Sequence, residues 1–173
     1  MKVTGRCHCG QISFEAEIDP AQVRICHCTD CQTLTGTAFR TNVSSLPGTF
    51  VLRSGTPKTY IKTAESGNKR AHGFCPECGT PIYSTAPGAN PASYGLRVGA
   101  LDRRAELRPT KQGWCRSALP WSMNITGVER FERQPQGPVI GQRIEDPQNG
   151  ARAALRFAFT SAGMSTPICC AGD

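Results

Sequence analysis

Three clusters of closely spaced cysteines constrain the fold of this chain more than any other feature of its sequence. They hold seven of the ten cysteines in 173 residues, and they are Cys7-His8-Cys9, Cys26-His27-Cys28-Thr29-Asp30-Cys31 and Cys75-Pro76-Glu77-Cys78. Cysteines in a reducing compartment serve as metal ligands more often than as disulfides. The chain must therefore fold so that short loops converge on metal ions.

The spacing within each cluster suits zinc. A zinc ion held by thiolates needs its sulfurs about 2.3 Å away in a tetrahedral arrangement. A Cys-x-x-Cys turn directs two sulfurs to one ion, and Pro76 and Gly79 supply the backbone conformations that such a turn favours. In a Cys-x-Cys pair, residues i and i+2 of an extended segment face the same side. The clusters therefore predict zinc–thiolate sites.

The seven cysteines divide naturally into a set of four and a set of three. Four thiolates close a structural zinc site, whereas three leave a position open for water or substrate, as in catalytic sites. Two pairings are possible, because Cys75 and Cys78 can join either the first cluster or part of the second. The first pairing leaves Cys26, Cys28 and Cys31 together as a compact three-ligand set.

Other interpretations of the cysteines stay open. All seven can serve purely structural zinc, with Cys115, His27 or His72 completing the second site. Cys28 and Cys31 also form a Cys-x-x-Cys pair that can undergo redox chemistry, although the βαβ pattern of a thioredoxin-like motif is missing. A lone cysteine such as Cys115 is more typically a buried small apolar residue than a ligand. A histidine between two ligands, such as His27, typically points to solvent.

The charge of the chain favours an anionic partner without identifying it. The net charge is +7, and residues 1–134 hold all of the excess. Such a field attracts nucleic acid, an acidic protein surface or a small anionic substrate. No apolar run approaches the roughly 18 residues of a membrane span, and no apolar signal segment follows Met1. We therefore expect a cytoplasmic protein that does not enter a membrane.

The first 134 residues have the pattern of a mostly β protein. Ile12, Phe14, Ala16 and Ile18 alternate with polar residues, which predicts a half-buried strand that ends before Pro20. No segment shows a sustained helical period. Further short runs rich in β-forming residues, separated by turn residues, predict strands over residues 38–43, 49–53, 58–62, 82–85, 94–98 and 125–131.

The texture of the sequence changes after residue 134. A proline- and glycine-containing linker leads into scattered small residues around one apolar group formed by Leu155, Phe157 and Phe159. The sequence therefore predicts two parts. Residues 1–134 form the zinc-binding domain, and residues 135–173 form a weakly structured, poorly ordered C-terminal extension.

Several stretches resemble one known family. They include GRCHCGQISF at residues 5–14, CHCTDCQ at residues 26–32, RSGTPKTY at residues 53–60, FCPECGTPI at residues 74–82 and GALD at residues 99–102. In this order they resemble the glutathione-dependent formaldehyde-activating enzymes, a family that also includes relatives of centromere protein V. The resemblance covers residues 3 to about 133, and the order of the three clusters is its most specific part.

The resemblance implies a fold and a set of metal ligands. The fold is a small zinc-binding domain of folded-over antiparallel sheets. The resemblance selects the first of the two pairings and implies two zinc ions per chain. A structural zinc is bound by Cys7, Cys9, Cys75 and Cys78, and a second zinc, whose open position serves catalysis, by Cys26, Cys28 and Cys31.

The implied activity is the addition of glutathione to formaldehyde, which forms S-hydroxymethylglutathione in the carbon–sulfur lyase class. The partners are then a small thiol and a small aldehyde. Glutathione carries two carboxylates, and the candidates to bind them are Arg103, Arg104, Arg108, Lys111 and Arg116.

One departure from the family bears on the substrate. Many members carry a histidine at the position of Gln112, just before Gly113 and Trp114. The alternative function is a non-catalytic zinc module that binds nucleic acid or protein. It is suggested by the positive charge and by the centromere relatives.

Overall fold

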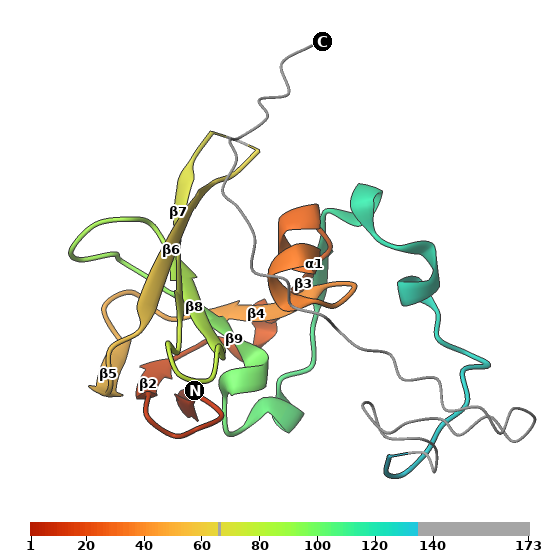
Figure 1. The fold of residues 1–173 in the computed structure, drawn as a ribbon, viewed down its shortest axis with the longest axis horizontal. Coiled ribbons are helices and arrows are strands. Elements are labelled where there is room, and N and C mark those ends of the chain that lie inside the picture. Colours follow the sequence, from red (N-terminus) through yellow and green to blue (C-terminus); the bar gives the residue numbers. More distant parts are fainter. Residues whose placement is uncertain (66, 135–173) are drawn as a thin grey trace, which may run out of the picture. The chain divides into compact units, whose positions relative to one another are not determined.

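The computed structural model of this chain describes residues 1–65 and 67–134. Contacts divide the chain into two units, Met1–Val128 and Glu129–Asp173, and the fold described here is that of the first. It consists of two β-sheets, one short α-helix and several single turns of 3₁₀-helix (Figure 1). The predicted mostly β class is confirmed, whereas the predicted extension lies outside the described residues.

The smaller sheet contains three antiparallel strands in the order β1-β2-β5. Their bounds are Lys2–Arg6 for β1, Ser13–Glu17 for β2 and Val51–Ser54 for β5. In β2 the side chains of Phe14 and Ala16 are buried, while their neighbours along the strand are only partly covered. This alternation is the one that the sequence predicts for a strand with one face on the core.

The larger sheet contains seven strands in the order β10-β3-β4-β9-β8-β7-β6. All neighbours are antiparallel except β10, which runs parallel to β3. The strand bounds are Arg24–Cys26 for β3, Arg40–Ser44 for β4, Lys58–Thr63 for β6, Lys69–Phe74 for β7, Pro81–Thr85 for β8, Gly95–Arg97 for β9 and Lys111–Gly113 for β10.

The helical segments are all short. Helix α1, Thr29–Thr35, begins just after β3 and ends before Gly36. The 3₁₀ turns are η1 at Pro20–Gln22, η2 at Val98–Ala100, η3 at Arg104–Glu106, η4 at Cys115–Ser117 and η5 at Pro120–Met123.

One hydrophobic core joins the two sheets. Val3 and Phe14 from the smaller sheet belong to the same buried cluster as Val43, Ile82 and Leu96 from the larger sheet. Full burial of a side chain of this kind stabilises the fold by about 1.5–3 kcal/mol. Cys7 and Cys75, which lie far apart in the sequence, also belong to this core. Candidate metal ligands and apolar side chains therefore share the same buried region.

Some local predictions were wrong or incomplete. Residues 125–131 form no strand, and Ile125 and Val128 are exposed at 67% and 64%. The backbone instead turns here, where the Val128 amide donates to the Ile125 carbonyl at 3.2 Å. The β-forming residues therefore have no neighbouring strand with which to pair. Conversely, β1, β3, β7, β10 and helix α1 were not predicted.

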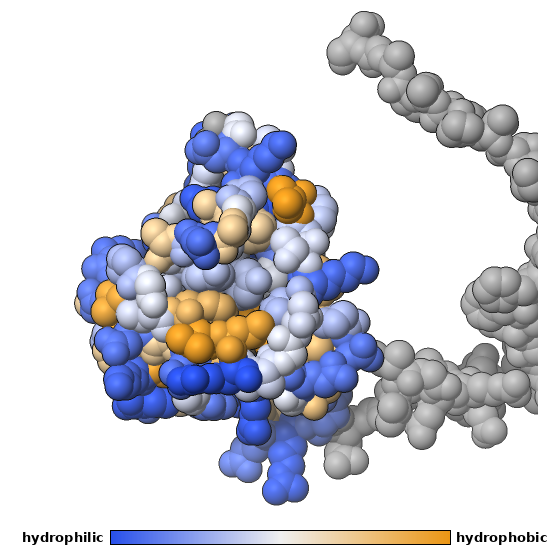
Figure 2. Space-filling model, turned by 90° about the vertical axis from the view of Figure 1, so that its left-hand side faces the viewer, coloured by the Kyte–Doolittle hydropathy of each residue, from blue (hydrophilic) through white to orange (hydrophobic). Residues whose placement is uncertain are grey.

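Apolar side chains are not confined to the core. Leu46, Val51 and Leu52 are each 39% exposed. On the face drawn in Figure 2, apolar side chains gather between hydrophilic ones. Within the described residues, no helix has the length and apolar character needed to cross a membrane.

Candidate metal centres

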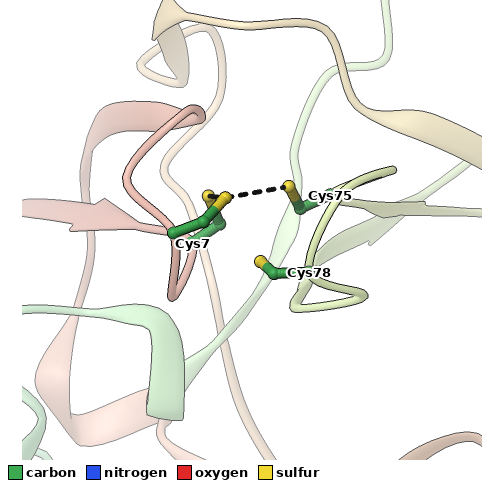
Figure 3. Close-up of side chains that lie close together, drawn as sticks. Cys7, Cys75 and Cys78 are labelled. Carbon is green, nitrogen blue, oxygen red and sulfur yellow. Dashed lines mark hydrogen bonds between the residues drawn. The ribbon is translucent and has the colours of Figure 1, made fainter.

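Two groups of cysteines converge in the structure, and the first contains four of them. The sulfurs of Cys7, Cys9, Cys75 and Cys78 all lie within 4.8 Å of one another. The sulfur of Cys9 is 3.4 Å from that of Cys7 and 3.7 Å from that of Cys75. In a tetrahedral thiolate site the sulfurs stand about 3.8 Å apart. The donors and their spacing therefore fit one zinc ion, and Figure 3 shows the two loops from which the side chains point toward one another.

Two tight loops carry this four-cysteine cluster. One connects β1 to β2, and its Gly10 amide donates to the Cys7 carbonyl at 3.1 Å. The other connects β7 to β8, and its Gly79 amide donates to the Cys75 carbonyl at 2.9 Å. Gly10 and Gly79 have φ values of 81° and 70°, which glycine adopts without strain. Since one loop belongs to each sheet, the cluster links the two sheets.

Hydrogen-bond donors surround the sulfurs of the four-cysteine cluster. Burial raises the pKa of Cys7, but the Ile12 amide, at 3.2 Å from the sulfur, together with Cys9 and Cys75, lowers it more. The Thr80 hydroxyl, at 3.1 Å, is the largest cause that lowers the pKa of Cys78 to about 5. The same hydroxyl accepts a hydrogen bond from the His8 amide at 3.0 Å, which joins the two loops. These donors favour the thiolate form that binds metal.

The second group is a three-cysteine cluster built from one short stretch of chain. Cys26 ends β3, Cys28 is the N-cap of α1, and Cys31 lies in the first turn of that helix. Their sulfurs lie within 4.8 Å of one another, with 3.5 Å between those of Cys26 and Cys28. The Cys31 amide donates to the Cys28 sulfur at 3.4 Å. Three thiolates at this spacing fit three corners of a zinc tetrahedron.

Among the described residues, no fourth cysteine, histidine or carboxylate joins the three-cysteine cluster. Cys115 lies exposed on η4, contrary to the expectation that it is buried. His27 is only 1% exposed, although the sequence suggested that it faces solvent. Its Nε2 lies 2.9 Å from the Oε1 of Gln112. His72, the third candidate to complete the site, also lies outside the cluster.

Hydrogen bonds on both sides hold the segment that carries Cys26 and Cys28. The His27 amide donates to the Gly113 carbonyl of β10 at 3.0 Å. The side-chain amide of Gln32, one helical turn into α1, donates to the His27 carbonyl at 2.8 Å. Gln112, which the sequence singled out as a departure from the family, is therefore in direct contact with the residue between two cysteines. The sequence alone offered no sign of this contact.

Two arginines next to the three-cysteine cluster were missed by sequence reasoning. Arg40 on β4 pairs with Cys26 on β3, and side chains of directly paired residues share one face of a sheet. Arg40 is 4% exposed, and Arg97 on β9 is 7% exposed. The Cys31 thiol is the largest cause that lowers the pKa of Cys26 to about 5, and the charge of Arg40 contributes. The only available sequence signal was an arginine inside each of two predicted strands.

The five basic residues proposed for carboxylate binding lie on the surface, and several engage other side chains. Arg103 forms two hydrogen bonds with Glu106, at 2.8 and 2.6 Å. Arg116 bonds to Glu65 at 2.5 Å, and its guanidinium carbon lies 4.8 Å from the Trp114 ring centroid. All five residues of the set are exposed, namely Arg103, Arg104, Arg108, Lys111 and Arg116.

Comparison with known proteins gives two results. The sequence model of the family described as glutathione-dependent formaldehyde-activating enzyme matches residues 2–117, which include all seven clustered cysteines. A solved protein of Rhodobacter sphaeroides is 22% identical, with a TM-score of 0.48. The match covers 63% of this chain and 98% of that protein.

Proposed function

Because the chain belongs to the glutathione-dependent formaldehyde-activating enzyme family, we propose that its three-cysteine cluster catalyses the addition of a thiol to an aldehyde. Membership of this family associates the chain with glutathione-dependent formaldehyde activation in general. The proposed reaction is the formation of S-hydroxymethylglutathione, which is a carbon–sulfur lyase reaction in reverse. The observation that carries the proposal is the set of Cys26, Cys28 and Cys31, to which no fourth ligand is added among the described residues.

The two clusters take different roles in this proposal. The four-cysteine cluster would hold a structural zinc, since four thiolates complete its coordination. The three-cysteine cluster would hold a second zinc and supply only three protein ligands to it. When bound there, zinc supplies a Lewis acid that favours the thiolate form of a substrate thiol and polarises an aldehyde oxygen.

The residues of the chain position and neutralise the reacting groups. The reaction forms a bond between the thiol sulfur and the aldehyde carbon. The π-electron pair of the carbonyl moves to oxygen, and the proton lost by the thiol passes through solvent to that oxygen. Arg40, which pairs with Cys26 across the sheet, adds positive charge beside the cluster and favours the anionic sulfur. His27 and Gln112 keep the cysteine segment in place.

Ligand-field spectroscopy tests the open position. With cobalt in place of zinc, glutathione should shift the absorption bands, because a soft thiolate is a preferred ligand. S-methylglutathione, which lacks the thiol, should shift them much less. No shift with any thiol would contradict an open site and would favour the alternative, a non-catalytic zinc module that binds nucleic acid or protein through the charge of +7.

Kinetics tests the reaction itself. The protein should form the hemithioacetal of glutathione and formaldehyde faster than the spontaneous reaction. Since the spontaneous addition is easy, the proper comparison is with the Cys28→Ser protein at equal concentration. A rate equal to that of Cys28→Ser would rule out catalysis at this cluster. Acceleration with another thiol or aldehyde, but not with glutathione and formaldehyde, would keep the reaction type and change the substrate.

A further inference from the structure

A pocket of about 450 Å³ lies where α1, β4, β6, β7, β8 and β9 contribute side chains. Its walls are largely apolar and include Leu34, Phe74 and Tyr83. Its charged lining comes from Arg40 and Arg97, which are the two arginines beside the three-cysteine cluster. We name this cavity, lined by these two arginines and His72, the arginine pocket.

In this pocket the two guanidinium groups approach one histidine nitrogen. The Nδ1 of His72 lies 3.4 Å from Nη1 of Arg40 and 3.1 Å from Nη2 of Arg97. A guanidinium group only donates hydrogen bonds, so Nδ1 accepts and the imidazole proton lies on Nε2. Burial and then the charge of Arg97 lower the pKa of His72 to about 4, which keeps the ring neutral. His72 therefore supplies no negative charge.

The arginines lack an acidic partner among the described residues. The ion pairs among the described residues all involve other basic side chains, namely those of Arg6, Arg53, Lys62, Arg103 and Arg116. The Nε atoms of Arg40 and Arg97 and the Nε2 of His72 are buried without a hydrogen-bond partner. Burial and then the charge of Arg40 lower the pKa of Arg97 to about 9, which is still protonated at neutral pH. Buried charges without partners are costly.

The nearest negative charges leave an imbalance. Both arginines interact electrostatically with the thiols of Cys26 and Cys31. Three thiolates and one divalent zinc carry a formal charge of −1, whereas the two arginines carry +2. One positive charge remains beside the cluster. An anion in the pocket would balance it and would accept hydrogen bonds where the residues offer mainly donors.

The geometry points to the arginine pocket as the site that holds a carboxylate of the thiol substrate, whose sulfur then reaches the three-cysteine cluster. This inference rests on the proposed function and assigns Arg40 and Arg97 to the binding of a substrate carboxylate. Carboxylates pair with guanidinium groups through charge-assisted, often bidentate hydrogen bonds. The apolar walls suit the hydrocarbon part of such a molecule.

A second pocket does not have this character. It has a volume of about 590 Å³ and lies beside Cys7 and Cys9 of the four-cysteine cluster. It contains basic residues as well, but Asp102 also lines it and lies 3.8 Å from the Nε of Arg6. Asp102 balances Arg6, and the formal charge of −2 on four thiolates and one divalent zinc would exceed the remaining charge of Arg104. This pocket therefore offers no comparable reason to bind an anion.

A matched pair of small thiols tests the inference on the cobalt-substituted full-length protein. The probes are 3-mercaptopropionate and its methyl ester, which differ only in the charge at the carboxyl end. Titrations followed by the cobalt bands should give a dissociation constant about tenfold lower for the acid. Equal affinities of the wild-type protein for acid and ester would overturn the inference, whatever any variant does.

Substitution of one arginine sharpens the test. In Arg97→Gln the advantage of the acid should fall to about twofold or less, while the affinity for the ester should stay unchanged. Arg97→Lys, which keeps the charge but not the planar donor pair, should restore part of the advantage. Arg53→Gln, at an exposed position on β5 of the smaller sheet, serves as the control and should keep the full advantage. Metal content and melting temperature verify that each variant is folded.

Propionate, which has no sulfur, separates this inference from the proposed function. Isothermal titration calorimetry should detect its binding to the wild-type protein and its loss in Arg97→Gln. If propionate binds in this way but no thiol shifts the cobalt bands, the anion site stands and the proposed function fails. If thiols shift the bands without preference for the acid, the proposed function stands and the carboxylate site fails.

Discussion

The two cysteine clusters differ in how far apart along the chain their members lie. The four-cysteine cluster unites loops about 66 residues apart, one from each sheet. Its Cys7 and Cys75 are 1% and 0% exposed. The three-cysteine cluster comes from β3 and the start of α1 alone, and its cysteines are all partly exposed. Two members of the four-cysteine cluster, Cys7 and Cys75, are thus part of the core, although Cys9 is exposed, whereas no member of the three-cysteine cluster is buried in the core.

This difference assigns the stability of the fold to the four-cysteine cluster and substrate access to the three-cysteine cluster. Ligation between distant loops closes a long stretch of chain, so metal binding there is also folding energy. Ligation within six residues orders little more than the start of one helix. Partial exposure, in turn, is what a substrate needs to reach the metal. If this contrast holds, loss of the metal from the three-cysteine cluster should leave the four-cysteine cluster and the fold intact.

The largest effect is expected from Cys75→Ser. Structural zinc sites contribute apparent free energies of about 10–16 kcal/mol, whereas whole domains are stable by about 5–15 kcal/mol. The variant should therefore show no cooperative thermal transition by circular dichroism and should lose both metals. Cys115→Ser, at an exposed cysteine outside both clusters, is the control and should melt like the wild type. A cooperative, native-like transition in Cys75→Ser would show that the four-cysteine cluster is not a folding element.

Cys28→Ser should have a smaller effect on stability but a full effect on the second metal. Serine is a good N-cap, so α1 should still begin at the same residue. We expect the metal content to fall from two ions to one, with a change in melting temperature of about 5 °C or less. Metal analysis and calorimetry measure the two quantities. Loss of both ions together with unfolding would refute the independence of the clusters.

Gln112→Ala should weaken metal binding at the three-cysteine cluster and leave metal binding at the four-cysteine cluster unchanged. Without the amide oxygen, the buried His27 Nε2 loses its partner and the segment between Cys26 and Cys28 loses a support. By analogy with outer supports of metal ligands, we expect a loss of about 10–100-fold in affinity for the second metal. Competition with a chelator measures the affinity of each site. Gln22→Ala, at an exposed position, is the control and should leave both affinities unchanged.

The smallest effect concerns acid sensitivity near the arginine pocket. Burial lowers the pKa of His72 from 6.5 to about 4, with further lowering by Arg97, Arg40, Lys62 and Arg70. The unfolded chain therefore binds this proton more tightly than the folded chain. The stability due to the neutral ring is fully present above about pH 6.5 and is lost as the pH falls toward about 4.

Between about pH 7 and pH 5.5, His72 should account for a loss on the order of 0.5–1 kcal/mol, after a reduction for solvent screening of the half-buried ring. Denaturant unfolding at several pH values should show this slope in the wild type and a flatter one in His72→Gln. Identical slopes in wild type and His72→Gln would contradict the role assigned to burial.

Much of the fold class and the ligand spacing within each stretch of cysteines followed from the sequence alone. The alternation around Phe14 and Ala16 depends only on neighbours along the chain, and the same is true of a Cys-x-x-Cys turn with glycine after it. Helix α1 escaped prediction because seven residues are too few to show a helical period. Strands β3 and β10 contain three residues each, which is too short for an alternation. The predicted strand at residues 125–131 was wrong because strand propensity needs a neighbouring strand to take effect.

The tertiary structure alone decided which residues from distant parts of the chain are in contact. The residues left two partners open for Cys75 and Cys78, and the packing of the two sheets brings them to Cys7 and Cys9. The sequence by itself determined that cysteine clusters of ligand spacing exist, since such spacing is local chemistry. It contained no sign that Arg40 meets Arg97 and His72, because that contact depends on the register of strands far apart along the chain. Strand register is settled by burial across the whole sheet, and no local stretch encodes it.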